Sequence, residues 1–399
     1  MVRTNLAVLI AQEDIGRHCG STMRLQLVAE TLVAAGTRVT TVGWASAQPL
    51  VTYGDVVVAG GRGAVGKLRA MLRGIALARA GATHVMLTSI GAPYNGFVAW
   101  YARRCGLTVI YDAQDPVFDA IPMVFGNGLL VRLATPLVRL SQHLLDRATH
   151  ATICAGGPRF EARMRAGGWR GPMFPLLNVH GLSDTAAARD PAVRRRYEWG
   201  NAKVVIYTGG LQRWRRITTQ IDAIGLARES GADVRLVLRG FFAQRDYGAY
   251  ARSRGLGDGA FTELREPLSG MAFHALLAAC DFAVSSERVD FITQSTICDA
   301  LADGLRVISI DDGRDINTYF GQFFRYYDGT AHDLARVLVE YDGRMPEDEW
   351  QTARERLAAL REESRANIRS AFGQAPAPPD TNSARTRLPE FGVNECGTR

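Results

Sequence analysis

A strand that ends in glycines and arginines is the first place in this sequence where a phosphate could bind. The apolar run from Val204 to Tyr207 is followed by TGGLQRWRR at 208–216, and a helix is expected directly after it. Glycine lets the backbone approach an anion, and arginine makes charge-assisted, often bidentate bonds to phosphate oxygens. Three cations at the positive end of a helix are better explained by a bound anion than by a solvated surface. The predicted diphosphate-binding residues are Gly209, Gly210, Arg213, Arg215 and Arg239, the last of which ends the next expected strand.

A second loop combines hydroxyl, amide and carboxylate groups before a short helix. It follows the expected strand from Phe282 to Ser285, and the helix is expected over Thr296 to Ala302. Asp299 would lie one turn inside this helix, where a carboxylate can accept both hydroxyls of a ribose while backbone amides hold a phosphate. A solvent-facing helical acid is the simpler interpretation of Asp299. The predicted donor-side residues here are Glu287, Asp290, Thr293, Gln294, Ser295, Thr296 and Asp299.

Two loops in the first half of the chain complete the set of candidates. Gly20 and Ser21 follow the first expected strand, where small residues let amides approach an anion, although an ordinary helix cap is the alternative. No GxGxxG motif is present to support a dinucleotide site. The strand expected at 107–112 ends in Asp112, and Gln114 and Asp115 follow it before a proline. Asp112 and Gln114 are predicted to bind an acceptor, and Asp115 to bind it or accept its proton, with a simple turn as the alternative.

These loops all follow strands of two successive α/β units. Short β-rich runs alternate with helical patterns to about residue 155, and the alternation restarts near 203 after a connection expected at 172–190. Such alternation predicts parallel sheets covered by helices on both faces, with ligands beyond the carboxyl ends of the strands. We predict domains at 1–178 and 179–345, a helix at 346–373 that packs back toward the first domain, and a disordered tail at 374–399.

The composition excludes several classes of protein. The 399 residues are 47% hydrophobic and 22% charged, which excludes wholesale disorder and a collagen-like chain. The 47 basic and 40 acidic residues give a net charge of +7, and they are expected to be interleaved, which argues against a nucleic-acid partner. Six cysteines without CxxC spacing predict reduced thiols in a cytoplasmic protein. No apolar run is long enough to predict a membrane span.

In this order the loops resemble those of retaining glycosyltransferases with the GT-B fold, closest to glycosyltransferase family 4. The stretch STICDALADGLRVI at 295–308 is similar to the family's carboxylate, Ala-Gly turn and valine-rich strand. YTGGL at 207–211 resembles its Gly-Arg-Leu phosphate loop, and PLLNVHG at 175–181 resembles its interdomain turn. Gly20-Ser21 matches its N-terminal small-residue loop. The resemblance implies two Rossmann-like, doubly wound domains that face a cleft, with C-terminal helices crossing back.

The sequence departs from the family's pair of glutamates, which have seven residues between them. The second glutamate corresponds to Asp299, and the position of the first is occupied by Phe291. A phenylalanine cannot bond a sugar hydroxyl. The role of the first glutamate would therefore pass to Glu287, Asp290 or the backbone near Thr293.

Two further departures move the predicted contacts. Gly210 stands where the family has the arginine of Gly-Arg-Leu, so the diphosphate contact shifts to Arg213, Arg215 or Arg216. The family's N-terminal histidine has no counterpart, and Asp115 takes over the acceptor side. The resemblance thus makes Asp115, Arg213 and Arg215 the predicted catalytic residues.

The resemblance implies that a sugar moves from a nucleotide diphosphate donor, UDP or GDP, to an acceptor with retention of the anomeric configuration. Arginines would stabilise the departing diphosphate in place of a metal, and no cofactor is expected. We expect a small-molecule acceptor, because the 45 arginines against two lysines are typical of GC-rich genomes with specialised metabolism. One alternative is a membrane-surface transferase with a lipid-linked or polysaccharide acceptor, suggested by basic and apolar residues at 62–73. Others are a non-catalytic nucleotide-binding GT-B protein, suggested by the missing glutamate, and a GT-B enzyme of another type such as an epimerase.

Overall fold

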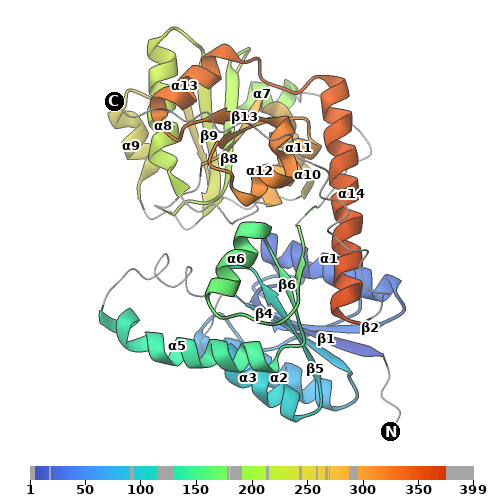
Figure 1. Cartoon of the computed structure of the whole chain (residues 1–399). Coiled ribbons are helices and arrows are strands. Elements are labelled where there is room, and N and C mark those ends of the chain that lie inside the picture. Colours follow the sequence, from blue (N-terminus) through green and yellow to red (C-terminus); the bar gives the residue numbers. More distant parts are fainter. Residues whose placement is uncertain are drawn as a thin grey trace, which may run out of the picture.

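The structure, a computed structural model, consists of two α/β domains with a long C-terminal helix running along both of them (Figure 1). It describes residues 5–17, 19–89, 94–115, 129–177, 179, 191–212, 215–241, 245–257, 259–265, 268, 270–286 and 295–373. The tail expected at 374–399 lies outside these residues.

The N-terminal domain is built on seven parallel strands in the order β3-β2-β1-β4-β5-β6-β7. These are β1 (Leu6–Asp14), β2 (Arg38–Trp44), β3 (Asp55–Val58), β4 (His84–Ser89), β5 (Thr108–Ala113), β6 (Ala151–Cys154) and β7 (Met173–Pro175). The continuous apolar run of the central strand β1 is buried on both sides, as a parallel sheet requires. One face is covered by α1 (Gly20–Ala34) and the end of α14 (Glu347–Ala371). The other is covered by α2 (Ala64–Arg79), α3 (Asn95–Arg104), α5 (Leu129–Ala148) and α6 (Pro158–Ala166).

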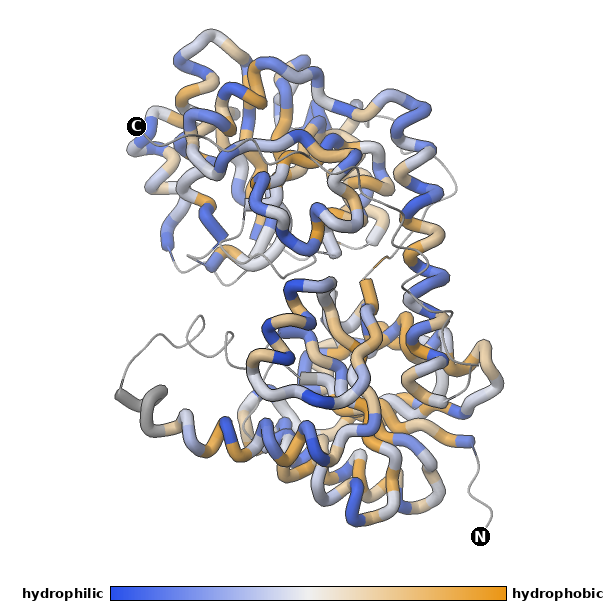
Figure 2. Tube along the Cα trace, in the orientation of Figure 1, coloured by the Kyte–Doolittle hydropathy of each residue, from blue (hydrophilic) through white to orange (hydrophobic). Residues whose placement is uncertain are grey.

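The C-terminal domain has six parallel strands in the order β10-β9-β8-β11-β12-β13. These are β8 (Lys203–Gly210), β9 (Val234–Phe241), β10 (Phe261–Leu264), β11 (Phe282–Ser285), β12 (Arg306–Ile310) and β13 (Phe324–Tyr327). On one face lie α7 (Pro191–Arg196), α10 (Gly270–Ala279), α11 (Ser295–Ala302), α12 (Asp315–Phe320) and the first part of α14, and on the other α8 (Ile217–Glu229), α9 (Tyr247–Ser253) and α13 (Ala331–Glu340). Hydrophobic residues concentrate in the strands of both domains (Figure 2).

The two domains are joined by a buried carboxylate as well as by α14. The backbone N–H groups of Gly157, Arg159 and Phe160, at the start of α6, each donate to the Asp315 carboxylate at 2.9 Å. Asp315 begins α12 in the other domain and is 1% exposed. In α14, Asn367 Nδ2 donates to the carbonyl of Pro175 at 2.8 Å. These contacts fix the edge of one sheet against the other.

The structure corrects the predicted elements at two places. The strand β7 lies at the start of the region expected as a plain connection at 172–190, because even its three residues gain a parallel partner in β6. Three polar residues, Gln12 to Asp14, extend β1 past a register shift after Ile10 instead of belonging to the loop that leads to Gly20 and Ser21. Polar side chains are tolerated in this extension because Gln12 Nε2 donates to Asn95 Oδ1 at 2.6 Å and Asp14 Oδ1 accepts from the backbone N–H of Ser46 at 3.0 Å.

Candidate active site between the domains

Two glycines lie side by side near the ends of β8 and β9, so neither strand has a side chain at this position. Gly209 pairs in register with Gly240. The φ of Gly209 is 137°, in the region that favours glycine. A Cβ on Gly240 would stand 2.1 Å from the carbonyl oxygen of Gly209, so any side chain would displace the neighbouring strand. Glycine is therefore required at position 240 by the close packing of β9 against β8 at this end of the sheet.

Arg239 lies next to these glycines as a buried cation. Its guanidinium carbon lies 4.8 Å from the centre of the Phe273 ring, and the residue is 8% exposed. Burial lowers the pKa of Arg239, and repulsion from Arg17, in the loop after β1 of the other domain, lowers it further, while Asp299 raises it. The positive charge of Arg17 thus acts on Arg239 from the other domain. A bound diphosphate would relieve this repulsion.

Asp299 is buried within α11, at 7% exposure, so the solvent-facing interpretation of this residue is wrong. Burial raises the pKa of Asp299 to about 7; His274 and Arg239 act against this shift, and Asp303 adds to it. His274 Nδ1 lies 2.7 Å from an oxygen of Asp303, and this hydrogen bond raises the pKa of His274. The carboxyl group of Asp299 therefore changes charge near neutral pH.

The start of α11 is held against the end of β8. Thr296 Oγ1 donates to the carbonyl oxygen of Thr208 at 3.4 Å. This bond brings the first turn of α11 to the strand end that carries the paired glycines. The predicted hydroxyl, carboxylate and phosphate-binding groups of the C-terminal domain therefore lie together, although they come from three separate parts of the sequence.

Arg215 is positioned by hydrogen bonds from its neighbours and faces the other domain. Its carbonyl oxygen accepts from Ser286 Oγ at 3.0 Å, and Gln220 Nε2 donates to that hydroxyl at 2.6 Å. Burial raises the pKa of Asp115, at the end of β5, and Glu13 adds to this effect, but the positive charge of Arg215 lowers it. The predicted catalytic residues Asp115 and Arg215 therefore belong to different domains and are close enough to interact electrostatically.

The predicted acceptor residues of the N-terminal domain form a chain of hydrogen bonds. Ser21 Oγ donates to Gln114 Oε1 at 2.5 Å, and Gln114 Nε2 donates to Asp112 at 3.3 Å. Asp112 is 1% exposed and forms an ion pair with Arg24 at 2.5 Å. A carboxylate so enclosed has little capacity left for an acceptor. Asp112 instead orients the side chain of Gln114 by accepting a hydrogen bond from it.

No protein-family model and no curated protein sequence matches the chain. Solved structures do match it over most of its length. HepE of Anabaena, solved with UDP and glucose, is 15% identical, with a TM-score of 0.65 over 92% of this chain and 98% of that one. Sucrose-phosphate synthase of Thermosynechococcus elongatus is 16% identical, with a TM-score of 0.62 over 92% and 94% of the two chains. Trehalose 6-phosphate synthase of Burkholderia multivorans is 14% identical, with a TM-score of 0.59 over 93% and 95%.

The chain has the GT-B fold. In this GT-B protein, five of the predicted site residues lie outside the described part of the chain: Arg213, Glu287, Asp290, Thr293 and Gln294. Within the described part, Arg215 of the C-terminal domain interacts electrostatically with Asp115 of the N-terminal domain.

The sequence did not identify four residues that shape this site. Arg17 had a signal, since it is a cation in the same loop as Gly20. Phe273, His274 and Asp303 had none, because they lie on helix α10 and after helix α11 rather than in strand-end loops. Only the packing of these helices brings their side chains to Arg239 and Asp299.

Proposed function

We propose that the protein transfers a sugar from a nucleotide diphosphate donor, with retention of configuration, to an acceptor held by the N-terminal domain. One observation carries this proposal: the charges of Arg239 and Asp299 interact beside the paired glycines, and the charge of Arg17 acts on Arg239 from the other domain. Such a cluster suits a nucleoside diphosphate, with a carboxylate for the ribose and cations for the phosphates. That HepE was solved with UDP and with UDP-glucose supports a donor of this class, UDP or GDP.

In the proposed complex the C-terminal domain binds the donor. Asp299, in its ionised form, accepts hydrogen bonds from the ribose hydroxyls, and Thr296 and the amides at the start of α11 hold the phosphates. Arg239 and Arg215 stabilise the negative charge that grows on the departing diphosphate, with Arg213 as a further candidate. Fixed charges aimed at developing charge are commonly the largest contribution to catalysis. No metal or cofactor takes part in the proposed reaction.

On the facing wall, Asp115 orients the hydroxyl of the acceptor toward the donor sugar. The raised pKa of Asp115 suits a carboxyl group that shares a proton with a bound hydroxyl. The departing phosphate can take the acceptor proton, so no protein nucleophile is required. Gly20 and Ser21 would lie near the donor phosphates. We propose a small-molecule acceptor first; the surface described in the next subsection favours the second candidate, a lipid-linked acceptor.

Turnover of sugar nucleotides tests the proposal. Purified protein should release nucleotide from a UDP-sugar or GDP-sugar, and NMR of the transferred sugar should show the donor's anomeric configuration. Asp299→Asn should lower the rate about 10- to 100-fold, the value of a hydrogen bond to a charged group. Asp342→Asn, at an exposed position of the same domain, should not. Tight nucleotide binding without any turnover would favour the non-catalytic alternative instead.

A further inference from the structure

The net positive charge of this protein is concentrated in one layer of three helices. Together α2, α3 and α5 contain nine lysines and arginines and a single acid, Asp146. The whole chain has 47 basic and 40 acidic residues, so the remainder has 38 and 39 and is almost neutral. No acidic residue occurs between Asp55 and Asp112. The expectation that acids and bases are interleaved is therefore wrong for this part of the chain.

The same three helices expose large apolar side chains. Helix α3 contacts both α2 and α5, and all three cover one face of the N-terminal sheet (Figure 1). Six of their apolar residues are between 39% and 50% exposed: Leu72, Phe97, Trp100, Tyr101, Leu137 and Leu140. We call these residues and the cations of α2, α3 and α5 the α2-α3-α5 face. Hydrophobic and hydrophilic positions alternate along α5 (Figure 2).

Cations on this face are paired with its aromatic rings. The guanidinium carbon of Arg104 lies 5.2 Å from the centre of the Trp100 ring, and Arg79 Nη1 donates to the Tyr101 hydroxyl at 3.0 Å. Backbone N–H of Gly96 donates to Ser141 Oγ at 3.0 Å, which fixes α3 against α5. The aromatic and basic groups therefore belong to one continuous surface.

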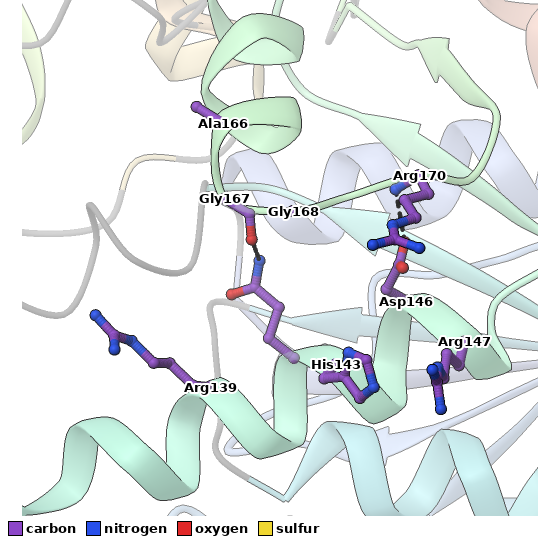
Figure 3. Close-up of a pocket in the computed structure, with 9 residues that line it drawn as sticks. Arg139, His143, Asp146, Arg147, Ala166, Gly167, Gly168 and Arg170 are labelled. Atoms are coloured by element: carbon purple, nitrogen blue, oxygen red, sulfur yellow. Dashed lines mark hydrogen bonds between the residues drawn. The ribbon is translucent and has the colours of Figure 1, made fainter.

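A hollow of about 490 Å³ opens between α5 and the loop after α6 (Figure 3). Arg139, His143 and Arg147, one helical turn apart, line it together with Arg170 from the loop after α6. Asp146, the one acid, already accepts a hydrogen bond from the backbone N–H of Arg170 at 2.8 Å. The buried Gln142 Oε1 has no hydrogen-bond partner among the described residues. A phosphate ester with a free hydroxyl would satisfy both the cations and this acceptor.

We propose that the α2-α3-α5 face docks on an anionic lipid bilayer, with the hollow beside α5 accepting a phosphate headgroup. Tryptophan, tyrosine and leucine insert at the interface of a bilayer, while arginine and lysine bind its anionic headgroups. A nucleic acid would match the charge but leave the exposed leucines and Phe97 unused. In the described chain no helix is both long and apolar enough to cross a membrane. This docking does not depend on the proposed sugar transfer.

Co-sedimentation with vesicles tests the docking with the whole chain. Vesicles of phosphatidylcholine alone are compared with vesicles that also contain phosphatidylglycerol, at low and high salt. The double variant Arg69→Gln/Arg73→Gln removes two exposed cations from α2, and Arg195→Gln/Arg196→Gln removes two neighbouring exposed cations from α7 as the matched control. Trp100→Ala is compared in the same way with Met271→Ala, at an exposed apolar position of α10.

The wild type should sediment with the phosphatidylglycerol vesicles only, and less so at high salt. The α2 double variant should bind them about 30-fold more weakly, since each cation near an anionic surface contributes about a fivefold factor. Trp100→Ala should also weaken binding, and neither control should. Absence of sedimentation, or equal losses in the α2 and α7 variants, would overturn the proposal. Displacement from the vesicles by duplex DNA, with Trp100→Ala unaffected, would also overturn it and indicate a nucleic-acid partner.

Discussion

Replacing Arg239 by methionine should weaken nucleotide binding strongly and change the stability of the ligand-free protein little. Methionine keeps most of the apolar stem of the side chain but removes the guanidinium group and its charge. A hydrogen bond to a charged group contributes about 1.5–3 kcal/mol, which corresponds to a Kd about 10- to 150-fold higher for the nucleoside diphosphate. In the ligand-free protein, the lost contact with the Phe273 ring costs about 0.5–2 kcal/mol. Relief of a buried charge and of repulsion from Arg17 offsets this cost.

Isothermal titration calorimetry with the nucleotide that binds the wild type measures the effect, and a melting curve measures stability. Arg235→Met is the matched control, because Arg235 lies four residues earlier on the same face of β9, at the end away from the glycine pair. The control should bind nucleotide as the wild type does. A Kd for Arg239→Met equal to that of the wild type, together with a melting temperature several degrees lower, would refute the reasoning and make Arg239 a structural residue.

Four further predictions concern Asp299, Gly240 and Asp315. Because burial raises the pKa of Asp299 to about 7, affinity for a sugar nucleotide should fall about tenfold from about pH 8 to about pH 6, and calorimetry should show no such fall in Asp299→Asn. Because the pKa of Asp299 is higher in the folded than in the unfolded state, its contribution to stability is present at low pH and is lost as the pH rises from about 4 to 7, so the melting temperature of the wild type relative to Asp299→Asn should drop over that range. Gly240→Ala should abolish nucleotide binding measured by calorimetry because its Cβ would clash with the Gly209 carbonyl, whereas Gly270→Ala, with open space around it, should leave binding intact. Asp315→Asn should lower the free energy of unfolding by about 3 kcal/mol in denaturant titrations, since the three amides of α6 lose a charged acceptor; an unchanged value would exclude the buried carboxylate as a clasp between domains.

Strong periodic patterns made most of the fold predictable from the sequence. The runs at Val204 to Tyr207 and Val234 to Leu238 are continuous and apolar, as strands buried on both faces must be, and the sheet contains both. Short strands such as β3 and β7 carry too few residues for a pattern, and only their neighbours in the sheet stabilise them. The end of β1 was harder still to predict, because polar residues extend this strand.

The candidate site was predictable only in part. Arg239 and Asp299 could be predicted from the sequence. Arg239 lies near the end of one strand and Asp299 in a helix that follows the end of another, and a parallel sheet brings such strand ends to one edge. Contacts across the domains, such as Arg17 with Arg239, depend on how two independent units dock, which no local pattern encodes. The ion pair of Arg24 with Asp112 is likewise a tertiary contact. It occupies a carboxylate that the sequence alone suggests is free to bind an acceptor. Uneven charge was visible in the sequence, but only the fold places α2, α3 and α5 in one layer.

A thermal-shift titration with UDP, GDP, dTDP and ADP tests the central claim most directly. A ligand at 100 times its Kd stabilises the folded state by about 2.7 kcal/mol, which is readily detected as a rise in melting temperature. We predict that UDP or GDP raises the melting temperature of the wild type and of Arg235→Met, and that of Arg239→Met by about half as much or less. If none of the four nucleotides shifts the wild type, the cluster around Arg239 and Asp299 is not a nucleotide site, and the proposed sugar transfer is contradicted.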